Sequence, residues 1–274
     1  MSIAHEINGE YLQEAPYRYD LDMVQMQELT ERLLAEREPR SDDRIVCYRL
    51  EQGSPYENVA RTIECEVFEK FFGNNAEEMA DEYGPYEPQS IFFLSVDQFS
   101  KQPAGVLRVI ENGPAGLKTL TDLETSEDPA VPHLSPNDVQ VHHEIESLDT
   151  CWDVGTVAVR KEYRASRAEA QETSVQLYRA LYTAALESGV DHFVSIIDAR
   201  PYDKMTNYLG IPFVPMAGSE PFSYLGSEKS YAAYGDVRKF YEKMNRKRKT
   251  VRGFMARKAL GPLVKGTADQ AINL

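Results

Sequence analysis

The chain of 274 residues contains no apolar run that approaches the roughly 20 residues needed to span a bilayer. Its polar and acidic beginning, MSIAHEINGEYLQEAPYRYD, lacks the features of a secretory signal peptide. Cysteine is scarce, and the three residues Cys47, Cys65 and Cys151 form no C-x-x-C pair. This odd, unpatterned set fits a reducing compartment, so we expect a cytoplasmic protein without a membrane span.

Basic residues are also in short supply, since 30 Lys and Arg stand against 44 Asp and Glu. The net charge of −14 disfavours non-specific binding of nucleic acid by the whole chain, and we expect no nucleic-acid partner. The basic residues are unevenly spread, because residues 238–258 hold ten of them and a single Glu. This segment suits an acidic partner, although a solvated C-terminal helix would have the same composition.

Metal-binding signatures are missing as well. The adjacent histidines of VHHE, His142 and His143, would point to opposite faces if they lay on a strand. No third ligand follows at the spacing of a zinc site. We therefore expect no metal.

The sequence does contain enough apolar residues, 42% of the chain, for the core of one large domain. Apolar residues at helical spacing predict helices, and short apolar or alternating runs predict strands. The expected helices cover residues 21–36, a stretch from about Val59 to Phe71, residues 169–188 and a short segment that ends at Gly210. The expected strands cover residues 44–50, 91–97, 104–110, 152–159, 192–198 and 230–236.

The succession of strand, helix and strand over residues 152–198 is a β-α-β crossover, so its two strands should run parallel. The fold class is therefore mixed α/β (α+β), with a central sheet flanked by helices. The proline-containing stretch 111–150 shows few periodic signals, which is typical of a functional or mobile loop. We expect an N-terminal helical extension over 1–43, a main domain over 44–236, and a basic C-terminal helix and tail over 237–274.

Five pieces, in this order, resemble the GNAT acyltransferase superfamily: VGTVAV, VRKEYR, ALESGV, HFVSIIDA and YLGIPF. More narrowly, EVFEKFF, MADEYG, GVLRVIENGPAGLKTLTDL and DARPYDKMTNYLGI are similar to segments of the autoinducer synthases and of related N-acyl amino acid synthases. Autoinducer synthases make N-acyl-homoserine lactones. The resemblance covers residues 45–235 and implies a GNAT-like acyltransferase domain.

Two positions depart from the pattern of the acetyl-CoA-dependent members. Their loop Q/R-x-x-G-x-G/A corresponds to RASRAE, in which Arg164 fits but Arg167 and Glu169 replace the glycines. Side chains there would crowd the backbone N–H groups that hold a pyrophosphate at a helix N-terminus. Thr206 stands where those members often carry a tyrosine that protonates the leaving thiolate. Both departures favour acyl carrier protein, which brings a single phosphate with its pantetheine arm.

The resemblance implies a reaction centre on the strand 152–159. This strand would separate from the strand 192–198, and the pantetheine arm would insert between them. Backbone N–H groups around Val157 and Val159 would then stabilise the charge that develops on the thioester oxygen. Asp153 aligns with an acidic family residue and would orient or deprotonate the amine, unless it is an ordinary aspartate at the start of a strand.

The resemblance also implies four contacts with the acceptor. Arg108 aligns with a family arginine, where it would pair with a substrate carboxylate; the alternative is a structural ion pair. Asp81 and Glu82 match an acidic family segment, but a solvated loop would look the same. Arg61 aligns with another family arginine, or it is a surface charge.

Three arginines lie at the strand-to-helix junction, namely Arg160, Arg164 and Arg167. They would bind the phosphate of the carrier arm or of CoA. The alternative is a plain charged loop beside Glu162 and Glu169.

The sequence thus predicts an N-acyltransferase similar to autoinducer synthases, which takes an acyl group from acyl carrier protein or acyl-CoA and delivers it to a small amine. The basic segment 238–258 would dock the acidic carrier protein. The alternatives are an acetyl-CoA-dependent N-acetyltransferase and a non-catalytic GNAT-like module that binds a ligand or a protein. Thr156 occupies the position of a family arginine, which speaks against lactone synthesis, and no residue demands S-adenosylmethionine.

Overall fold

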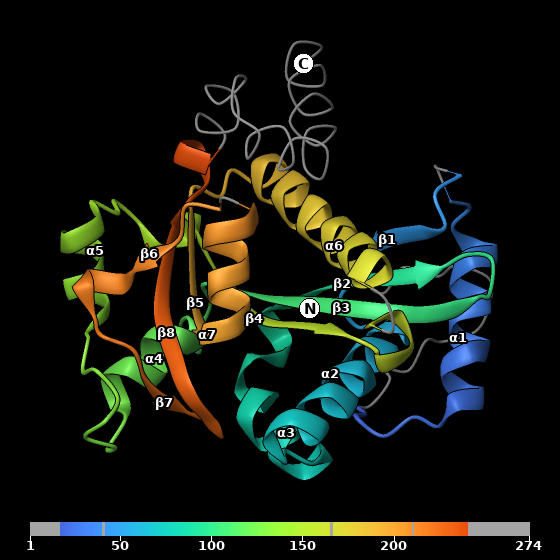
Figure 1. The fold of residues 1–274 in the computed structure, drawn as a ribbon, viewed down its shortest axis with the longest axis horizontal. Coiled ribbons are helices and arrows are strands. Elements are labelled where there is room, and N and C mark those ends of the chain that lie inside the picture. The colour runs from blue at the N-terminus through green and yellow to red at the C-terminus, as the bar shows by residue number, and fades with distance from the viewer. Residues whose placement is uncertain (1–16, 40–41, 165–166, 210, 241–274) are drawn as a thin grey trace, which may run out of the picture.

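A single mixed sheet organises the computed structural model, which describes residues 17–39, 42–164, 167–209 and 211–240, without the side chains of 167–171, 208 and 209 (Figure 1). Its strand order is β1-β2-β3-β4-β5-β8-β6, and β7 also pairs with β8. All described pairs are antiparallel except β4 with β5, which is parallel as predicted. The strands are β1 Ile45–Arg49, β2 Ser90–Asp97, β3 Gln102–Glu111, β4 Cys151–Val159, β5 His192–Asp198, β6 Val214–Pro215, β7 Phe222–Tyr224 and β8 Ser227–Asp236.

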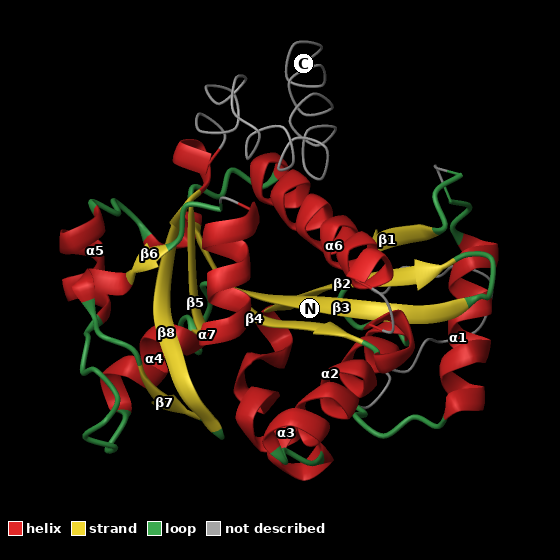
Figure 2. Cartoon of the chain, in the orientation of Figure 1, coloured by secondary structure: helices red, strands yellow, loops and turns green. Residues whose placement is uncertain are grey.

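Helices lie on both faces of this sheet, and short 3₁₀ turns join several elements (Figure 2). The α-helices are α1 Met23–Glu36, α2 Tyr56–Phe72, α3 Ala76–Tyr83, α4 Lys118–Thr125, α5 Pro136–His143, α6 Arg167–Glu187 and α7 Ala199–Asp203. A π-helical turn, Lys204–Leu209, continues α7. None of the described helices is long and apolar enough to cross a bilayer.

Local sequence explains most of the helix ends. Asp22 caps α1 and Asn75 caps α3, each in a capping box with the residue three positions later. Gly73 ends α2 in the left-handed conformation with φ 84°, which glycine adopts without a steric penalty. α4 is different, because its N-cap residue, Leu117, has no side chain that can accept a hydrogen bond.

The two faces of the sheet carry separate apolar clusters. α6 and α7 cover one face, where Leu181 packs with Trp152 and Val154 of β4. α1 and α2 cover the opposite face, where Met26 packs with Ile63 and with β2 and β3. The described part of the predicted N-terminal extension is therefore built into the main core.

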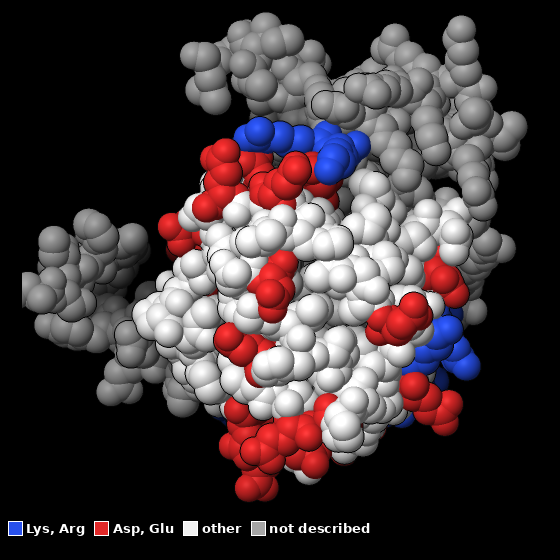
Figure 3. Space-filling model, turned by 90° about the vertical axis from the view of Figure 1, so that its left-hand side faces the viewer, with Lys and Arg blue, Asp and Glu red and all other residues white. Residues whose placement is uncertain are grey.

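A third cluster joins α4 and α5 to β5 and β8, through residues such as Leu120, Val139 and Tyr234. The stretch 111–150, which showed few periodic signals, contains these two helices. His142 and His143 lie at the end of α5 and not on a strand. On the described surface beside α4 and α5, acidic side chains form separate groups among uncharged ones (Figure 3).

The predicted basic C-terminal part, 237–274, lies outside the described residues except for its first four positions. Val237 and Phe240 are buried against the α6 cluster. Arg238 pairs with Asp191, and Lys239 pairs with Asp236.

Candidate functional site

The parallel strands β4 and β5 pair only at their beginnings. Three residue pairs join them, and the last pair is Asp153 with Val194. Beyond this point β4 stays with β3, whereas β5 stays with β8 (Figure 1). In the described part of the chain, the sheet thus divides into two halves along the second half of β4.

In the second half of β4, where β5 is no longer paired with it, some backbone N–H groups point toward the β5 side. Arg160 donates its backbone N–H to the carbonyl of Ala104 at 2.9 Å, so Arg160 points its peptide groups at β3. Residues of an antiparallel strand alternate between pointing toward the partner strand and pointing away from it. The N–H groups of Val159 and Val157 are therefore directed away from β3, toward β5.

A β-bulge marks the place where the two strands part. Arg108 pairs with Thr156 and Val109 pairs with Val154, so Gly155 is an extra residue on β4. A bulge bends its strand and increases the local twist. The bend therefore lies just after the point where β4 stops pairing with β5.

Asp153 is completely buried one position after Trp152, on the face opposite α6. Its carboxylate accepts a hydrogen bond from the backbone N–H of Thr119 at 2.5 Å and another from the Thr119 hydroxyl at 3.0 Å. Asp153 thus caps the N-terminus of α4 from a distant strand. Burial raises the pKa of Asp153 to about 7, although these hydrogen bonds and Lys118 act in the opposite direction.

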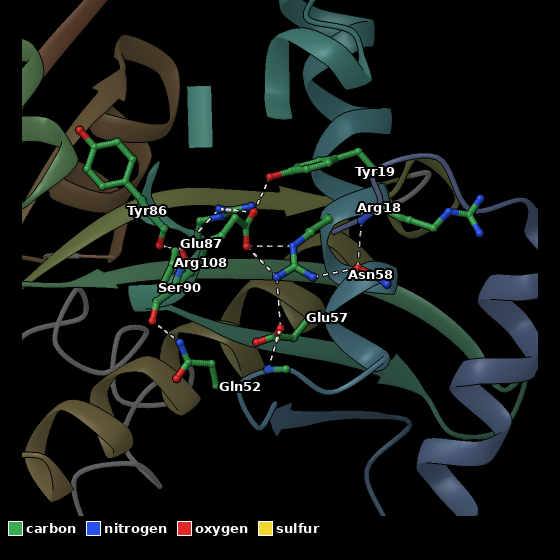
Figure 4. Close-up of polar contacts among 12 residues, drawn as sticks. Arg18, Tyr19, Gln52, Glu57, Asn58, Tyr86, Glu87, Ser90 and Arg108 are labelled. Atoms are coloured by element: carbon green, nitrogen blue, oxygen red, sulfur yellow. Dashed lines mark hydrogen bonds and ion pairs between the residues drawn. The ribbon is translucent and has the colours of Figure 1, made fainter. Parts of the chain in front are cut away.

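Arg61 is a buried arginine of α2, only 2% exposed, and is therefore not a surface charge. Its guanidinium contacts Glu87 at 2.6 and 2.9 Å, Glu57 at 3.1 Å and the amide oxygen of Asn58 at 2.8 Å (Figure 4). Tyr19, which precedes α1, donates its hydroxyl to the same Glu87. Groups of this chain already surround the guanidinium.

Arg108 on β3 is fully buried and forms the structural ion pairs that the sequence left open as an alternative. Its guanidinium lies 2.6 Å from Glu64 and 3.1 Å from Glu87, so Glu87 bridges Arg108 and Arg61. Thr156 donates its hydroxyl to Glu64. Burial opposes the charge of Arg108, but the two carboxylates raise its pKa well above the ordinary value. Contact of either arginine with an acceptor carboxylate stays a prediction.

The two acidic residues of MADEYG behave differently. Asp81 is exposed, whereas Glu82 is partly buried and pairs with Lys118 at the start of α4. Lys118 also contacts Asp122 at 2.5 Å and the hydroxyl of Tyr224 at 3.1 Å. Lys118 therefore ties α3, α4 and β7 together beside Asp153.

The three junction arginines also separate. Arg160 is buried and pairs with Glu66 of α2 at 2.9 Å. Arg164 stacks on Phe71 with its guanidinium carbon 4.7 Å from the ring centroid, and its buried Nε lacks a described hydrogen-bond partner. Burial lowers the pKa of Arg164. Of the segment RASRAE, residues 165 and 166 lie outside the described residues, and so do the side chains of 167–169, including that of Arg167.

Two other sequence expectations concern the short helix and the histidines. The hydroxyl of Thr206 donates to the carbonyl of Tyr202 at 2.8 Å. Nε2 of His143 accepts the backbone N–H of Ala217 at 2.9 Å, which requires an unprotonated nitrogen. Among the described residues there is no group of three potential metal ligands.

Several polar residues at this site were not predicted. Glu64 follows Arg61 by nearly one helical turn, so a helical wheel of α2 would have placed the two on neighbouring positions. Glu87 and Thr119 carry no such local signal, because their partners lie on other elements. Lys118 has an i,i+4 partner in Asp122, but nothing local indicates its pairing with Glu82 of α3.

The described residues have the GNAT-like fold that the sequence predicted. The N-acyl amino acid synthase FeeM from uncultured soil microbes matches with a TM-score of 0.50 and 17% identity, over 73% of this chain and 94% of that chain. The AHL synthase LasI matches with a TM-score of 0.47 and 16% identity, over 70% of this chain and 89% of that chain.

A CoA-dependent acyl-homoserine lactone synthase, BjaI, determined with SAM and isopentyl-CoA, matches with a TM-score of 0.40 and 14% identity, over 66% of this chain and 65% of that chain. No family model matches the sequence, and no curated protein does. At such identities the likeness describes the fold, so the activity has to be argued from the site.

Proposed function

We propose that the protein is an N-acyltransferase that moves an acyl group from a thioester to the amine of a small molecule. The observation that carries this proposal is the early separation of β5 from β4, which leaves the N–H groups of Val157 and Val159 directed into the space between the strands. A thioester carbonyl held there would meet fixed donors where negative charge develops.

Asp153, whose side chain lies on the face of β4 opposite α6, supports the same reaction. The amine must be neutral when it attacks the carbonyl carbon, so a base has to accept its proton. A carboxyl whose pKa is raised to about 7 by burial is suited to this exchange near neutral pH. Its two hydrogen bonds to Thr119 would hold it in one orientation.

Arg164 is the described cation that best fits the donor's phosphate. It lies just before α6, and its Nε lacks a described partner. Arg160, in contrast, is engaged by Glu66. The proposed donor is acyl-CoA or acyl carrier protein, since both attach the acyl group to a phosphopantetheine arm.

Thiol release in the presence of amines tests the proposed function. Purified protein is mixed with acyl-CoA and acyl carrier protein of several chain lengths, and products are identified by mass spectrometry together with small molecules extracted from overexpressing cells. An N-acylated product with one donor class supports the proposal and identifies the donor. Donors that stay intact with every amine would exclude it and favour a non-catalytic binding module.

The variant Arg164→Ala tests the phosphate contact. We expect KM for acyl-CoA to rise by about tenfold, since a charge-assisted hydrogen bond is lost. KM for an S-acyl pantetheine without phosphate should stay unchanged. Equal effects on both donors would argue for a structural role of the Phe71 contact instead.

We also propose that the segment 238–258 docks acyl carrier protein, on the basis of its charge alone. Replacement of the four basic residues at 246–249 by Ser should weaken carrier binding and reduce its salt dependence. Affinity that is unchanged across a salt series would exclude this docking site.

A further inference from the structure

Tyr83, the last residue of α3, lies between two cations. It is 4% exposed, with the guanidinium carbon of Arg108 4.3 Å from its ring centroid and Nζ of Lys118 5.5 Å away. Both cations are fixed by carboxylates, Arg108 by Glu64 and Lys118 by Glu82 among others. The ring therefore has little freedom to turn away.

The hydroxyl-bearing end of Tyr83 reaches β4 at the bulge. A Cβ placed on Gly155 would lie 3.6 Å from Cε1 of Tyr83, a ring carbon next to the one that carries the hydroxyl. Gly155 comes two positions after the last residue of β4 that pairs with β5. The phenol thus meets the strand where the proposed thioester would lie.

The state of this phenol suits a proton donor. None of the hydrogen bonds observed in the described part of the chain uses the Tyr83 hydroxyl, unlike the hydroxyls of Tyr19 and Tyr224. Burial, together with Glu64 and Glu82, raises the pKa of Tyr83, so the group is protonated at neutral pH, while Lys118 and Arg108 act against that rise. The same two cations would stabilise a transient phenolate.

The proposed reaction needs such a donor. When the amine nitrogen bonds to the carbonyl carbon, the C–S bond breaks and the sulfur leaves as a thiolate, which has to be protonated. Thr206, the hydroxyl on the short helix after β5, already donates to a backbone carbonyl. The hydrogen of its hydroxyl is therefore already engaged.

We propose that Tyr83 is the general acid that gives its proton to the leaving thiolate. This assignment rests on the proposed acyl transfer. In the step, the N–C bond forms, the C–S bond breaks, the amine proton passes to Asp153 or water, and the phenolate formed at Tyr83 is reprotonated from solvent. Tyr83 is then a catalytic residue from α3, on the face opposite α6.

The variant Tyr83→Phe tests this role, because it removes the hydroxyl but keeps the ring between the cations. We expect kcat with an S-acyl pantetheine to fall by about 100-fold, with little change in KM. With a thiophenyl ester of the same acyl group, whose thiolate is a better leaving group, the loss should shrink to less than about threefold. A purely structural tyrosine would lower both rates by the same factor.

The control is Tyr182→Phe, since Tyr182 is buried against Phe240 on the other face of the sheet. It should leave both rates at the wild-type level. If wild-type protein turns over and Tyr83→Phe matches it, or loses the same factor with both esters, the assignment of Tyr83 is wrong while the proposed function stands. If wild-type protein releases no thiol from any donor, the proposed function itself fails, and the assignment with it.

Discussion

Both faces of β3 and β4 carry apolar clusters, but in the described part of the chain the face under α2 and α3 also buries a network of charges. On the face under α6, Trp152 and Val154 pack with aliphatic and aromatic side chains. On the face under α2 and α3, Arg108 and its carboxylates are buried together. Apolar packing loses stability in proportion to the atoms removed, whereas a buried charge network fails when one member is lost and its partners stay ionised.

The largest effect is expected for Arg108→Met, which removes the cation shared by Glu64 and Glu87 and leaves Glu64 buried without its ion-pair partner, whereas Glu87 keeps Arg61. The free energy of unfolding should fall by about 4 kcal/mol, as measured by urea denaturation. The double variant Arg108→Met/Glu64→Gln should recover at least about 1 kcal/mol, because it removes the uncompensated charge of Glu64. A double variant that is no more stable than the single one would show that Arg108 acts mainly by packing.

A somewhat smaller effect is expected on the apolar face. Leu181→Ala removes a buried side chain of α6 and should cost about 3 kcal/mol. Because neither leucine nor alanine titrates, this loss should not depend on pH between about pH 5 and pH 8, the range in which histidines titrate. A clear pH dependence would mean that the two faces are coupled.

Asp153 gives a pH test of the polar face. A carboxyl whose pKa is raised on folding stabilises the protein below its unfolded pKa, and this contribution is lost as the pH rises through the folded value. With a folded pKa of about 7, the stability of the wild-type protein should fall relative to Asp153→Asn between about pH 4 and pH 7. Parallel stability curves for the two proteins would show that Asp153 does not titrate in this range.

The smallest effect should come from an exposed ion pair. Arg238 contacts Asp191 through two hydrogen bonds of 2.7 and 2.8 Å, but its side chain is 77% exposed. Arg238→Ala should therefore change stability by less than about 0.5 kcal/mol. A loss as large as that of Arg108→Met would remove the distinction between buried and exposed pairs.

Periodicity was enough to predict the main strands and the long helices, because apolar side chains follow the repeat of each element. α5 was missed although Ser135, Pro136 and Asp138 form a recognisable helix start, since the helix has only eight residues. α4 had no such signal to find. Its cap is Asp153, 34 positions away, and only the folded sheet brings the two together.

The candidate site shows the same limit. The separation of β4 from β5 was expected from the family resemblance, and the structure confirms it. The bridge that Glu87 forms between Arg61 and Arg108 could not be read from the sequence, because Glu87 belongs to a 3₁₀ turn between α3 and β2. Ion pairs between different helices and strands produce no periodic pattern in the sequence.

The single extra residue at Gly155 changes which residues of β4 point to each face of the sheet. Before it, Trp152 and Val154 belong to the α6 face; after it, Val157 does, while Thr156 and Ala158 face α2. A chimera that takes β4 from a protein without a bulge would need two separate alignments with this strand, one before Gly155 and one after it. If one alignment were used for the whole strand, a valine would lie among the carboxylates and a threonine would lie in the apolar cluster.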